Sequence, residues 1–236
     1  MPASETGSGR PLDRREVLGW DTVNWARSLA LWERWLPAAP AECLEIGCGP
    51  GGGVSLWLAS KGHNLLCTDM NAPGAAVRER HLRHGVADRI SYEAIDATRI
   101  PYEGRFDVVV LKSVFGGIWA FGGESSVLRA IEGIHRALRP GGRLLFAENL
   151  RGTAFHMFCR KVLLRRANTW HYPRAASFLR LLGDDWAELH YETSGFLGTF
   201  GRTERQREWL GRVDEAARPL VPAGWRYIIS GVAVKR

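Results

Sequence analysis

Apolar residues recur along the first part of the chain with the spacing of a helix. Between residues 14 and 36 they stand three, four or seven positions apart, at Leu18, Trp25, Leu29, Trp32 and Leu36. This spacing places them on one face of an amphipathic helix, and Pro37 marks its end. We therefore predict an N-terminal helix over residues 14–36, after a disordered start at residues 1–13.

From residue 42 onward, short apolar runs alternate with amphipathic segments. The predicted strands are residues 43–47, 64–69, 89–96, 106–112 and 143–149, and the predicted helices are residues 54–62, 75–85 and 125–142. Alternating strands and helices indicate a parallel sheet with helices on its faces. The fourth run is apolar on both faces, which is typical of a central parallel strand. The pattern predicts an α/β fold with a doubly wound, mostly parallel sheet.

The pattern changes after residue 149. Residues 150–183 are basic and mostly helical, and we call them the basic helical cap, an expected insertion after the fifth strand. Residues 184–236 predict two final strands, at 186–196 and 225–235, and a helix at 203–220. We expect a single domain over residues 1–236, with its core at residues 42–149.

Composition narrows the class of protein. Hydrophobic residues make up 45% of the chain and charged residues 24%, as in soluble globular proteins. No apolar run approaches the roughly 20 residues of a membrane span, and the start has no signal-peptide core, so we predict a cytoplasmic location. The cysteines (Cys43, Cys48, Cys67 and Cys159) form no CxxC pair, and His81 and His84 lack ligand partners, so no metal site is predicted.

The net charge of +7 is unevenly distributed. Residues 1–150 hold 17 basic and 17 acidic side chains, whereas residues 151–236 hold 15 and 8. Residues 151–183 contain seven bases and no acid. Such a segment is a solvated face, or it attracts an anionic small substrate, an anionic membrane or a nucleic acid.

A glycine-rich segment follows the first predicted strand. Residues 47–53 read Gly-Cys-Gly-Pro-Gly-Gly-Gly, and glycines let a backbone turn tightly and approach a ligand closely. The spacing Gly47-x-Gly49-x-x-Gly52 also fits the dinucleotide-binding pattern, with Asp69 about 20 residues on. Glu45 favours a ligand with an amino-acid ammonium, because its carboxylate would repel a pyrophosphate. Asp96 follows the third strand at the same carboxyl edge, where it can accept a hydrogen bond from an adenine amino group.

Together these motifs resemble those of class I S-adenosylmethionine-dependent methyltransferases, over roughly residues 42–149. Glu45-x-Gly47-x-Gly49-x-Gly51 is similar to the first motif of the family, and Asp69 to the acidic residue after its second strand. Asp96-Ala97 resembles its adenine-side motif, residues 106–112 its fourth strand, and residues 138–146 its turn into the fifth strand. The resemblance implies a Rossmann-like sheet of seven strands with an antiparallel last strand, for which residues 225–235 are the candidate.

The resemblance also implies which residues hold S-adenosylmethionine. Glu45 and the backbone of Gly47, Cys48, Gly49 and Gly51 would contact its methionine part, and Asp69 its ribose hydroxyls. Met70 and Ala97 would pack on the adenine faces, and Asp96 would bind the adenine amino group. Lys112, at the end of the fourth strand, is expected to meet the cofactor carboxylate or an anionic acceptor.

The segment after the fourth strand bears on the acceptor. Residues 112–117 lack the Asn/Asp-Pro-Pro-Tyr/Phe pattern of methyltransferases that act on amino or nucleobase nitrogen. Without a recognisable RNA-binding module, the sequence disfavours nucleic acid and favours a small-molecule acceptor. Glu45 and the lack of a Tyr-x-x-x-Lys pair oppose a nicotinamide-dependent oxidoreductase. Methylation of RNA or protein stays open, as does a non-catalytic protein that binds anionic partners through the basic helical cap.

Transfer to a hydroxyl needs a group that takes its proton, and histidine suits this role. His156 and Arg160 stand four residues apart, so a base and an anion clamp share one helix face. Glu148 and His171 are the other catalytic candidates, and Asn149 and Tyr172 the other acceptor-binding candidates. We predict O-methylation of a polar or anionic small molecule, such as a sugar, a glycan precursor or a secondary metabolite. Peripheral membrane contact stays open, and no oligomeric state is predicted.

Overall fold

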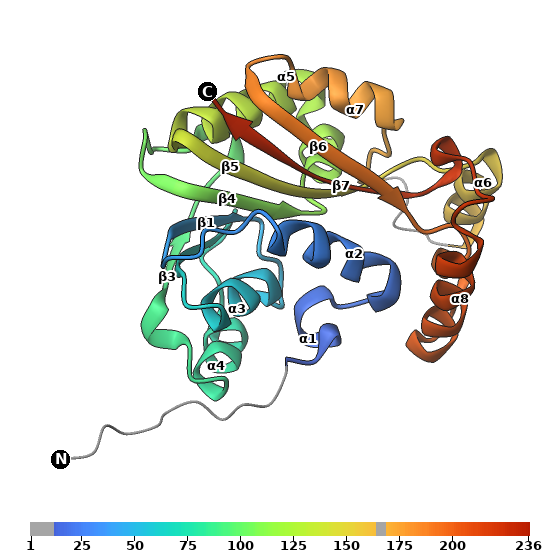
Figure 1. Cartoon of the computed structure of the whole chain (residues 1–236), viewed down its shortest axis with the longest axis horizontal. Coiled ribbons are helices and arrows are strands. Elements are labelled where there is room, and N and C mark those ends of the chain that lie inside the picture. Colours follow the sequence, from blue (N-terminus) through green and yellow to red (C-terminus); the bar gives the residue numbers. More distant parts are fainter. Residues whose placement is uncertain (1–11, 164–168) are drawn as a thin grey trace.

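The computed structural model describes residues 12–163 and 169–236. Within them, a seven-stranded sheet in the order β3-β2-β1-β4-β5-β7-β6 has helices on both faces (Figure 1). The strands are β1 (Glu42–Ile46), β2 (Asn64–Asp69), β3 (Ile90–Ala94), β4 (Phe106–Lys112), β5 (Leu138–Asn149), β6 (Trp186–Ser194) and β7 (Ile228–Lys235). The helices are α1 (Arg14–Leu18), α2 (Thr22–Glu33), α3 (Gly53–Ser60), α4 (Ala75–Arg83), α5 (Phe115–Ala137), α6 (Ala154–Leu163), α7 (Ala175–Leu182) and α8 (Glu204–Ala217).

The strand pairing confirms the predicted seven-stranded α/β sheet. Strands β1 to β5 pair in parallel. β7 lies between β5 and β6 and runs antiparallel to both. The sheet is therefore mixed, with one antiparallel edge, and β7 is the antiparallel last strand that the resemblance implied.

The central strand β4 is buried on both faces, because successive side chains of a strand point to opposite sides. Val108 and Val110 pack with the residues of α1 to α4, whereas Val109 and Leu111 pack with those of α5 and α7. None of these four side chains is exposed. Lys112 therefore leaves the core only at the carboxyl end of the strand, on the α2 side of the sheet.

The predicted helix over residues 14–36 is two helices in the structure. α1 ends at Gly19 (φ 83°), and Asp21 (φ 48°) precedes α2 in the left-handed region. Glu204 of α8 accepts hydrogen bonds from the backbone N–H groups of Asp21 (3.1 Å) and Thr22 (3.0 Å). A side chain far along the sequence thus satisfies the free N–H groups of α2, which the apolar spacing does not reveal.

Helix α5 begins at Phe115, well before the predicted start at residue 125, and bends at Gly123, whose backbone is not helical. Gly116 and Gly117 in its first turn lie against the indole of Trp170. A Cβ on Gly117 would lie 3.1 Å from Cζ3 of that ring. The two glycines lower the helix propensity of this turn, and the close indole explains their presence.

In the described residues, the basic helical cap forms no single lid. In α7, the ring of Phe178 lies 5.8 Å from that of Phe115 and 5.4 Å from that of Phe146, so this helix covers the sheet beside α5. α6 lies instead beyond the end of β5, near α8 (Figure 1). Residues 164–168 of the basic helical cap and residues 1–11 of the predicted disordered start lie outside the described residues. No helix in the described ranges is long and apolar enough to cross a membrane.

Candidate functional site

The glycine loop (residues 47–53) connects the carboxyl end of β1 to α3. Gly47, Gly49 and Gly52 have φ values of 70°, 60° and 56°, which side chains with a Cβ rarely adopt. A Cβ on Gly47 would lie 2.7 Å from Cγ2 of Val114, whereas a Cβ on Gly49 would meet no atom within 4 Å. Packing against Val114 therefore requires glycine at position 47, and Gly49 faces open space that a ligand can enter.

Asp69 ends β2, and its carboxylate holds the glycine loop. Oδ2 accepts a hydrogen bond from the backbone N–H of Gly49 (2.8 Å), and Oδ1 accepts one from Met70 (2.7 Å). The backbone N–H of Cys48 donates to the carbonyl of Thr68 at 2.9 Å. Each oxygen of Asp69 has further lone pairs that can accept from hydroxyl groups. Met70 beside it is 64% exposed.

Asp96 follows β3 and caps a short 3₁₀ turn, Ala97–Arg99. Its Oδ1 accepts hydrogen bonds from the backbone N–H (2.9 Å) and the hydroxyl (2.8 Å) of Thr98. The bond from the backbone N–H is the main cause of the lowered pKa of Asp96, so the carboxylate is ionised near neutral pH. Oδ2 accepts no hydrogen bond from a described residue, and the adjacent Ala97 is buried.

Glu45 lies at the carboxyl end of β1 and is 3% exposed. Its Oε2 accepts hydrogen bonds from the backbone N–H (3.0 Å) and the hydroxyl of Ser55. Burial raises the pKa of Glu45 to about 7 in spite of these bonds. The carboxylate expected to meet a ligand ammonium thus anchors the first turn of α3 to β1 in this structure.

Lys112 ends β4, the strand beside β1. Its Nζ lies 4.4 Å from the centroid of the Trp25 ring. Loss of solvation lowers the pKa of Lys112 to about 8, although the carboxylates of Glu148, Glu45 and Asp21 favour the charged form. The structure thus places a poorly solvated amine at the carboxyl edge of the sheet.

Glu148, predicted as a catalytic carboxylate, is fully buried. Its Oε2 accepts hydrogen bonds from the backbone N–H groups of Val114 (2.9 Å), Phe115 (2.7 Å) and Gly116 (3.4 Å), and Oε1 accepts one from Asn149 (2.8 Å). These donors include the free N–H groups of the first turn of α5. The carboxylate therefore caps a helix and complements its dipole, and burial raises its pKa.

His156, the predicted base, lies on the inner face of α6 and is not exposed. Its Nδ1 accepts a hydrogen bond from the hydroxyl of Thr153 (2.7 Å), and its Nε2 donates one to the carbonyl of Phe196 (2.7 Å). Burial lowers the pKa of His156. Both nitrogens of a neutral ring are thus occupied by protein groups.

Arg160 shares this inner face with His156, as the spacing predicts, and is 4% exposed. Its Nη1 donates a hydrogen bond to the carbonyl of Leu150 (2.8 Å), and its guanidinium lies 4.1 Å from the centroid of the Tyr172 ring. The predicted clamp therefore fastens α6 to the end of β5. Asn149 is occupied as well, because its Nδ2 donates to the hydroxyl of Ser113 (2.9 Å).

His171 lies beside the first turn of α5, and its ring stacks on that of Trp119 with centroids 4.2 Å apart. Its backbone N–H donates to the carbonyl of Gly116 (3.0 Å). It lines a small apolar pocket with Phe115 and Phe178, on the α5 side of the sheet. Because Lys112 lies on the α2 side, the structure does not bring His171 and Lys112 together.

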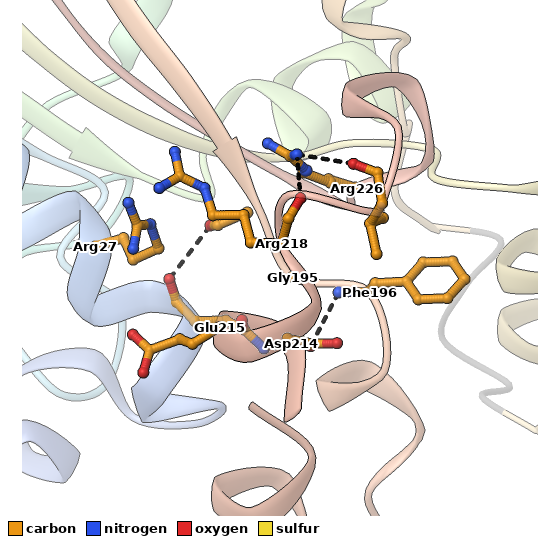
Figure 2. Close-up of a pocket in the computed structure, with 10 residues that line it drawn as sticks. Arg27, Gly195, Phe196, Asp214, Glu215, Arg218 and Arg226 are labelled. Atoms are coloured by element: carbon orange, nitrogen blue, oxygen red, sulfur yellow. Dashed lines mark hydrogen bonds between the residues drawn. The ribbon is translucent and has the colours of Figure 1, made fainter. Parts of the chain in front are cut away.

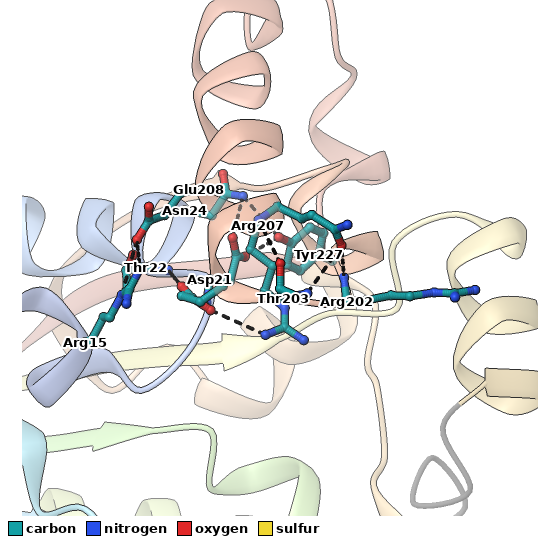
Figure 3. A network of polar contacts seen from close by, with 11 residues as sticks. Arg15, Asp21, Thr22, Asn24, Arg202, Thr203, Arg207, Glu208 and Tyr227 are labelled. Carbon is teal, nitrogen blue, oxygen red and sulfur yellow. Dashed lines mark hydrogen bonds and ion pairs between the residues drawn. The ribbon is translucent and has the colours of Figure 1, made fainter.

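A buried polar network links the start of α2 to α8 and to Tyr227 (Figure 3). The sequence-based predictions did not include it. Asn24 donates hydrogen bonds to Asp21 (3.1 Å) and Asp214 (2.9 Å), and the hydroxyl of Tyr227 donates to Asp21. Burial raises the pKa of Asp21 to about 7. The sequence signal for this network is the Asp21-x-x-Asn24 spacing on one helix turn. It could not reveal the network, because the partners Asp214 and Tyr227 stand 190 and 206 residues further along the chain.

A pocket bounded by α2, the end of β6 and α8 contains three arginines, Arg27, Arg218 and Arg226 (Figure 2). Glu192 pairs with Arg27 and Arg218, each at 3.0 Å. Arg226 donates to the carbonyls of other residues around the pocket, such as Val221 (2.7 Å). The residues that line this pocket include neither the glycine loop nor Asp69 nor Asp96. The pocket is therefore separate from the predicted cofactor site.

Comparison with known proteins gives one family match and several relatives. Residues 44–146 match the family model described as a methyltransferase domain. Methyltransferase GfsG of Streptomyces halstedii is 33% identical over 137 residues, 52% of this chain and 43% of that protein. The ubiquinone biosynthesis O-methyltransferase of Pseudomonas syringae pv. tomato is 32% identical over 139 residues, 58% of this chain and 53% of that protein. The chain thus spans about half the length of these curated relatives.

A solved structure extends the comparison beyond the matched region. A phosphoethanolamine N-methyltransferase of Haemonchus contortus, in complex with phosphomonomethylethanolamine and S-adenosylhomocysteine, superposes with a TM-score of 0.60 at 20% identity. The match covers 89% of this chain and 52% of that one, which establishes a shared fold. Residues 44–146 are therefore a methyltransferase domain, within a chain that has the Rossmann-like fold of class I S-adenosylmethionine-dependent methyltransferases.

Proposed function

We propose that this protein transfers the methyl group of S-adenosylmethionine to an oxygen of a small polar or anionic molecule. The observation that carries the proposal is a row of groups at neighbouring strand ends. Asp96 follows β3, Asp69 ends β2 and the glycine loop follows β1, in the order of these strands in the sheet. An elongated ligand laid along this edge would meet all three in turn.

The residues of this row fit S-adenosylmethionine. The open space at Gly49 admits the methionine part, and the free lone pairs of Asp69 suit the ribose hydroxyls. The Oδ2 of Asp96 is available to the adenine amino group, with Met70 and Ala97 beside the ring. When bound, S-adenosylmethionine supplies a methyl carbon on a positively charged sulfur. Positioning and exclusion of water are then the main tasks of the protein.

Two features support the acceptor class. Four basic residues of the basic helical cap are exposed, namely Arg151, Lys161, Arg174 and Arg180, so their field attracts anions. The ubiquinone biosynthesis relative is named as an O-methyltransferase, which favours oxygen over nitrogen. Transfer to RNA or protein and binding without catalysis are the alternative functions.

The test is a methyl-transfer assay with S-adenosylmethionine labelled in its methyl group. Phenols, sugars, nucleotide sugars, RNA and a protein extract are offered as acceptors, and products are identified by mass spectrometry. Label in the ether oxygen of a small molecule supports the proposal. Label in RNA or protein alone, or cofactor binding without label in any acceptor, contradicts it.

Replacing Asp69 with alanine is expected to weaken binding of S-adenosylmethionine by about 1–3 kcal/mol. The variant loses the ribose acceptor and the bond that holds Gly49. Calorimetric titration measures the change, with Asp88→Ala as the control because Asp88 is exposed after α4. If Asp69→Ala and Asp88→Ala bind S-adenosylmethionine with equal affinity, Asp69 is not part of the cofactor site.

Replacing His156 with alanine is expected to destabilise the fold by about 2–4 kcal/mol, because Thr153 and Phe196 lose a buried partner. The turnover of the folded variant is expected to change by less than about tenfold. Urea unfolding and the transfer assay measure the two effects. A loss of turnover of roughly 10²–10⁴-fold at unchanged stability would restore His156 as the base.

A further inference from the structure

The amine of Lys112, which the sequence predicts to meet the cofactor carboxylate or an anionic acceptor, has no hydrogen-bonding protein partner among the described residues. Its Nζ donates no hydrogen bond to a described residue and forms no ion pair with a described side chain. It lies over the face of the Trp25 ring, 4.4 Å from the ring centroid. Lys112 is half-buried, and an ammonium group has three donors, which only solvent or a ligand can accept from at this position. The amine is therefore available to a ligand at the carboxyl edge of the sheet.

The acidic side chains that face Lys112 are committed to other contacts. Glu45 of β1 binds Ser55, and Glu148 of β5 caps α5. Asp21, before α2, binds Asn24 and Tyr227. These carboxylates favour the ammonium form through space, but loss of solvation outweighs them and lowers the pKa of Lys112 to about 8. Near neutral pH, the neutral amine is therefore accessible.

Strand order places Lys112 on the acceptor side of the proposed cofactor. Asp96, Asp69 and the glycine loop follow β3, β2 and β1, and β4 is the next strand. Lys112 therefore lies beyond the methionine end of the row, at the end from which the methyl group is transferred. A sulfonium close to Lys112 would further disfavour the ammonium form.

We propose that Lys112 binds the reacting hydroxyl of the acceptor and takes its proton, and that the acceptor is a phenol or an enol. This inference rests on the proposed methyl transfer. Phenolic hydroxyls ionise near pKa 10, close enough to a lysine amine for efficient proton transfer. Sugar hydroxyls are far less acidic, so the amine of Lys112 favours phenols and enols over sugars.

The proposed step balances without another reactant. The O–H bond of the acceptor breaks, and its proton goes to the neutral Nζ of Lys112. The oxygen forms a bond to the methyl carbon, whose bond to sulfur breaks with the electron pair left on sulfur. The products are a methyl ether, a thioether and the Lys112 ammonium, which then releases its proton to solvent.

The first test measures the amine directly. The chain has four lysines, Lys61, Lys112, Lys161 and Lys235, so protein labelled with ¹³C-lysine gives four resolvable Cε signals. Lys112→Arg assigns its signal by loss. In the complex with S-adenosylhomocysteine, this signal is expected to titrate near the pKa of about 8. A normal lysine pKa, about 10.4, would overturn the proposal.

The second test separates the acceptor role from a cofactor role. The probe is 4-nitrophenol, whose absorbance reports its ionisation, added to the S-adenosylhomocysteine complex below neutral pH. Wild-type protein is expected to enrich the bound phenolate, and Lys112→Met is expected to lose this enrichment while binding S-adenosylhomocysteine within about threefold of wild type. Lys61→Met is the matched control, because Lys61 pairs with Glu33 on the surface.

Turnover distinguishes a base from a fixed charge. Lys112→Arg keeps the charge but cannot take a proton, so its kcat for a phenolic acceptor is expected to fall by roughly 10²–10⁴-fold. Near-normal turnover in Lys112→Arg, or phenolate enrichment in Lys112→Met, contradicts the proposal. A loss of S-adenosylhomocysteine affinity above about tenfold in Lys112→Met assigns the amine to the cofactor instead. If the wild type binds neither S-adenosylmethionine nor S-adenosylhomocysteine, the proposed function itself fails, and this inference fails with it.

Discussion

Replacing Glu148 with alanine is expected to lower the free energy of unfolding by about 3–5 kcal/mol, because several buried N–H groups lose their acceptor and each costs about 1–3 kcal/mol. The donors are the backbone N–H groups of Val114, Phe115 and Asn149. The first two open α5, so the loss should loosen the segment between Lys112 and the first turn of this helix. Urea unfolding near neutral pH measures the change.

Glu148→Gln is the matched variant for this prediction. It keeps the shape of the side chain and one acceptor oxygen, so its loss of stability is expected to be about 1 kcal/mol. Turnover of the folded glutamine variant should stay within about tenfold of wild type, since the carboxylate positions α5. A loss above about 10²-fold in this variant, with its stability kept, would return Glu148 to the catalytic groups.

Replacing Asp21 with asparagine is expected to change how stability depends on pH. Burial raises the pKa of Asp21 to about 7 in the folded protein, from 3.8. Between these values the folded state holds a proton that the unfolded state has released, so stability falls as pH rises. Wild type should lose about 1.4 kcal/mol per pH unit relative to the variant, or about 2–3 kcal/mol between pH 5 and pH 8.

Urea unfolding of both proteins across this range measures the difference. The variant keeps the other titrating groups, so their contributions cancel in the comparison. The new asparagine side chain can still accept from Asn24 and donate to the hydroxyl of Tyr227, which preserves the contacts of Figure 3. A difference in stability that stays constant with pH would show that Asp21 is already ionised in the folded protein.

The core of the fold was predictable because its signals are local. The run from Phe106 to Lys112 is apolar on both faces, and it is the buried central strand β4. Gly47 and Gly49 have positive φ, which favours glycine, so the residue types alone mark the loop. The break between α1 and α2 was missed because Glu204, from the other end of the chain, stabilises it.

In the candidate site, likewise, the cofactor side was predictable from local sequence signals and the acceptor side was not. Asp69 ends β2 and Asp96 closely follows β3, so the carboxyl edge where they lie can be read from the sequence. The acceptor side depends on which polar groups find protein partners. His156 and Arg160 do share a helix face, but Phe196 and Leu150 occupy them. Sequence spacing shows which side chains share a face, whereas only packing shows which of them remain available to a ligand.

One measurement tests the central claim most directly. Purified wild-type protein is titrated by calorimetry with S-adenosylmethionine, S-adenosylhomocysteine and NADH, with Asp69→Ala beside it. We expect micromolar binding of the first two ligands, weakened in the variant, and no binding of NADH. Binding of NADH alone, or binding of none of the three by a folded protein, would contradict the assignment of the glycine loop, Asp69 and Asp96 to S-adenosylmethionine.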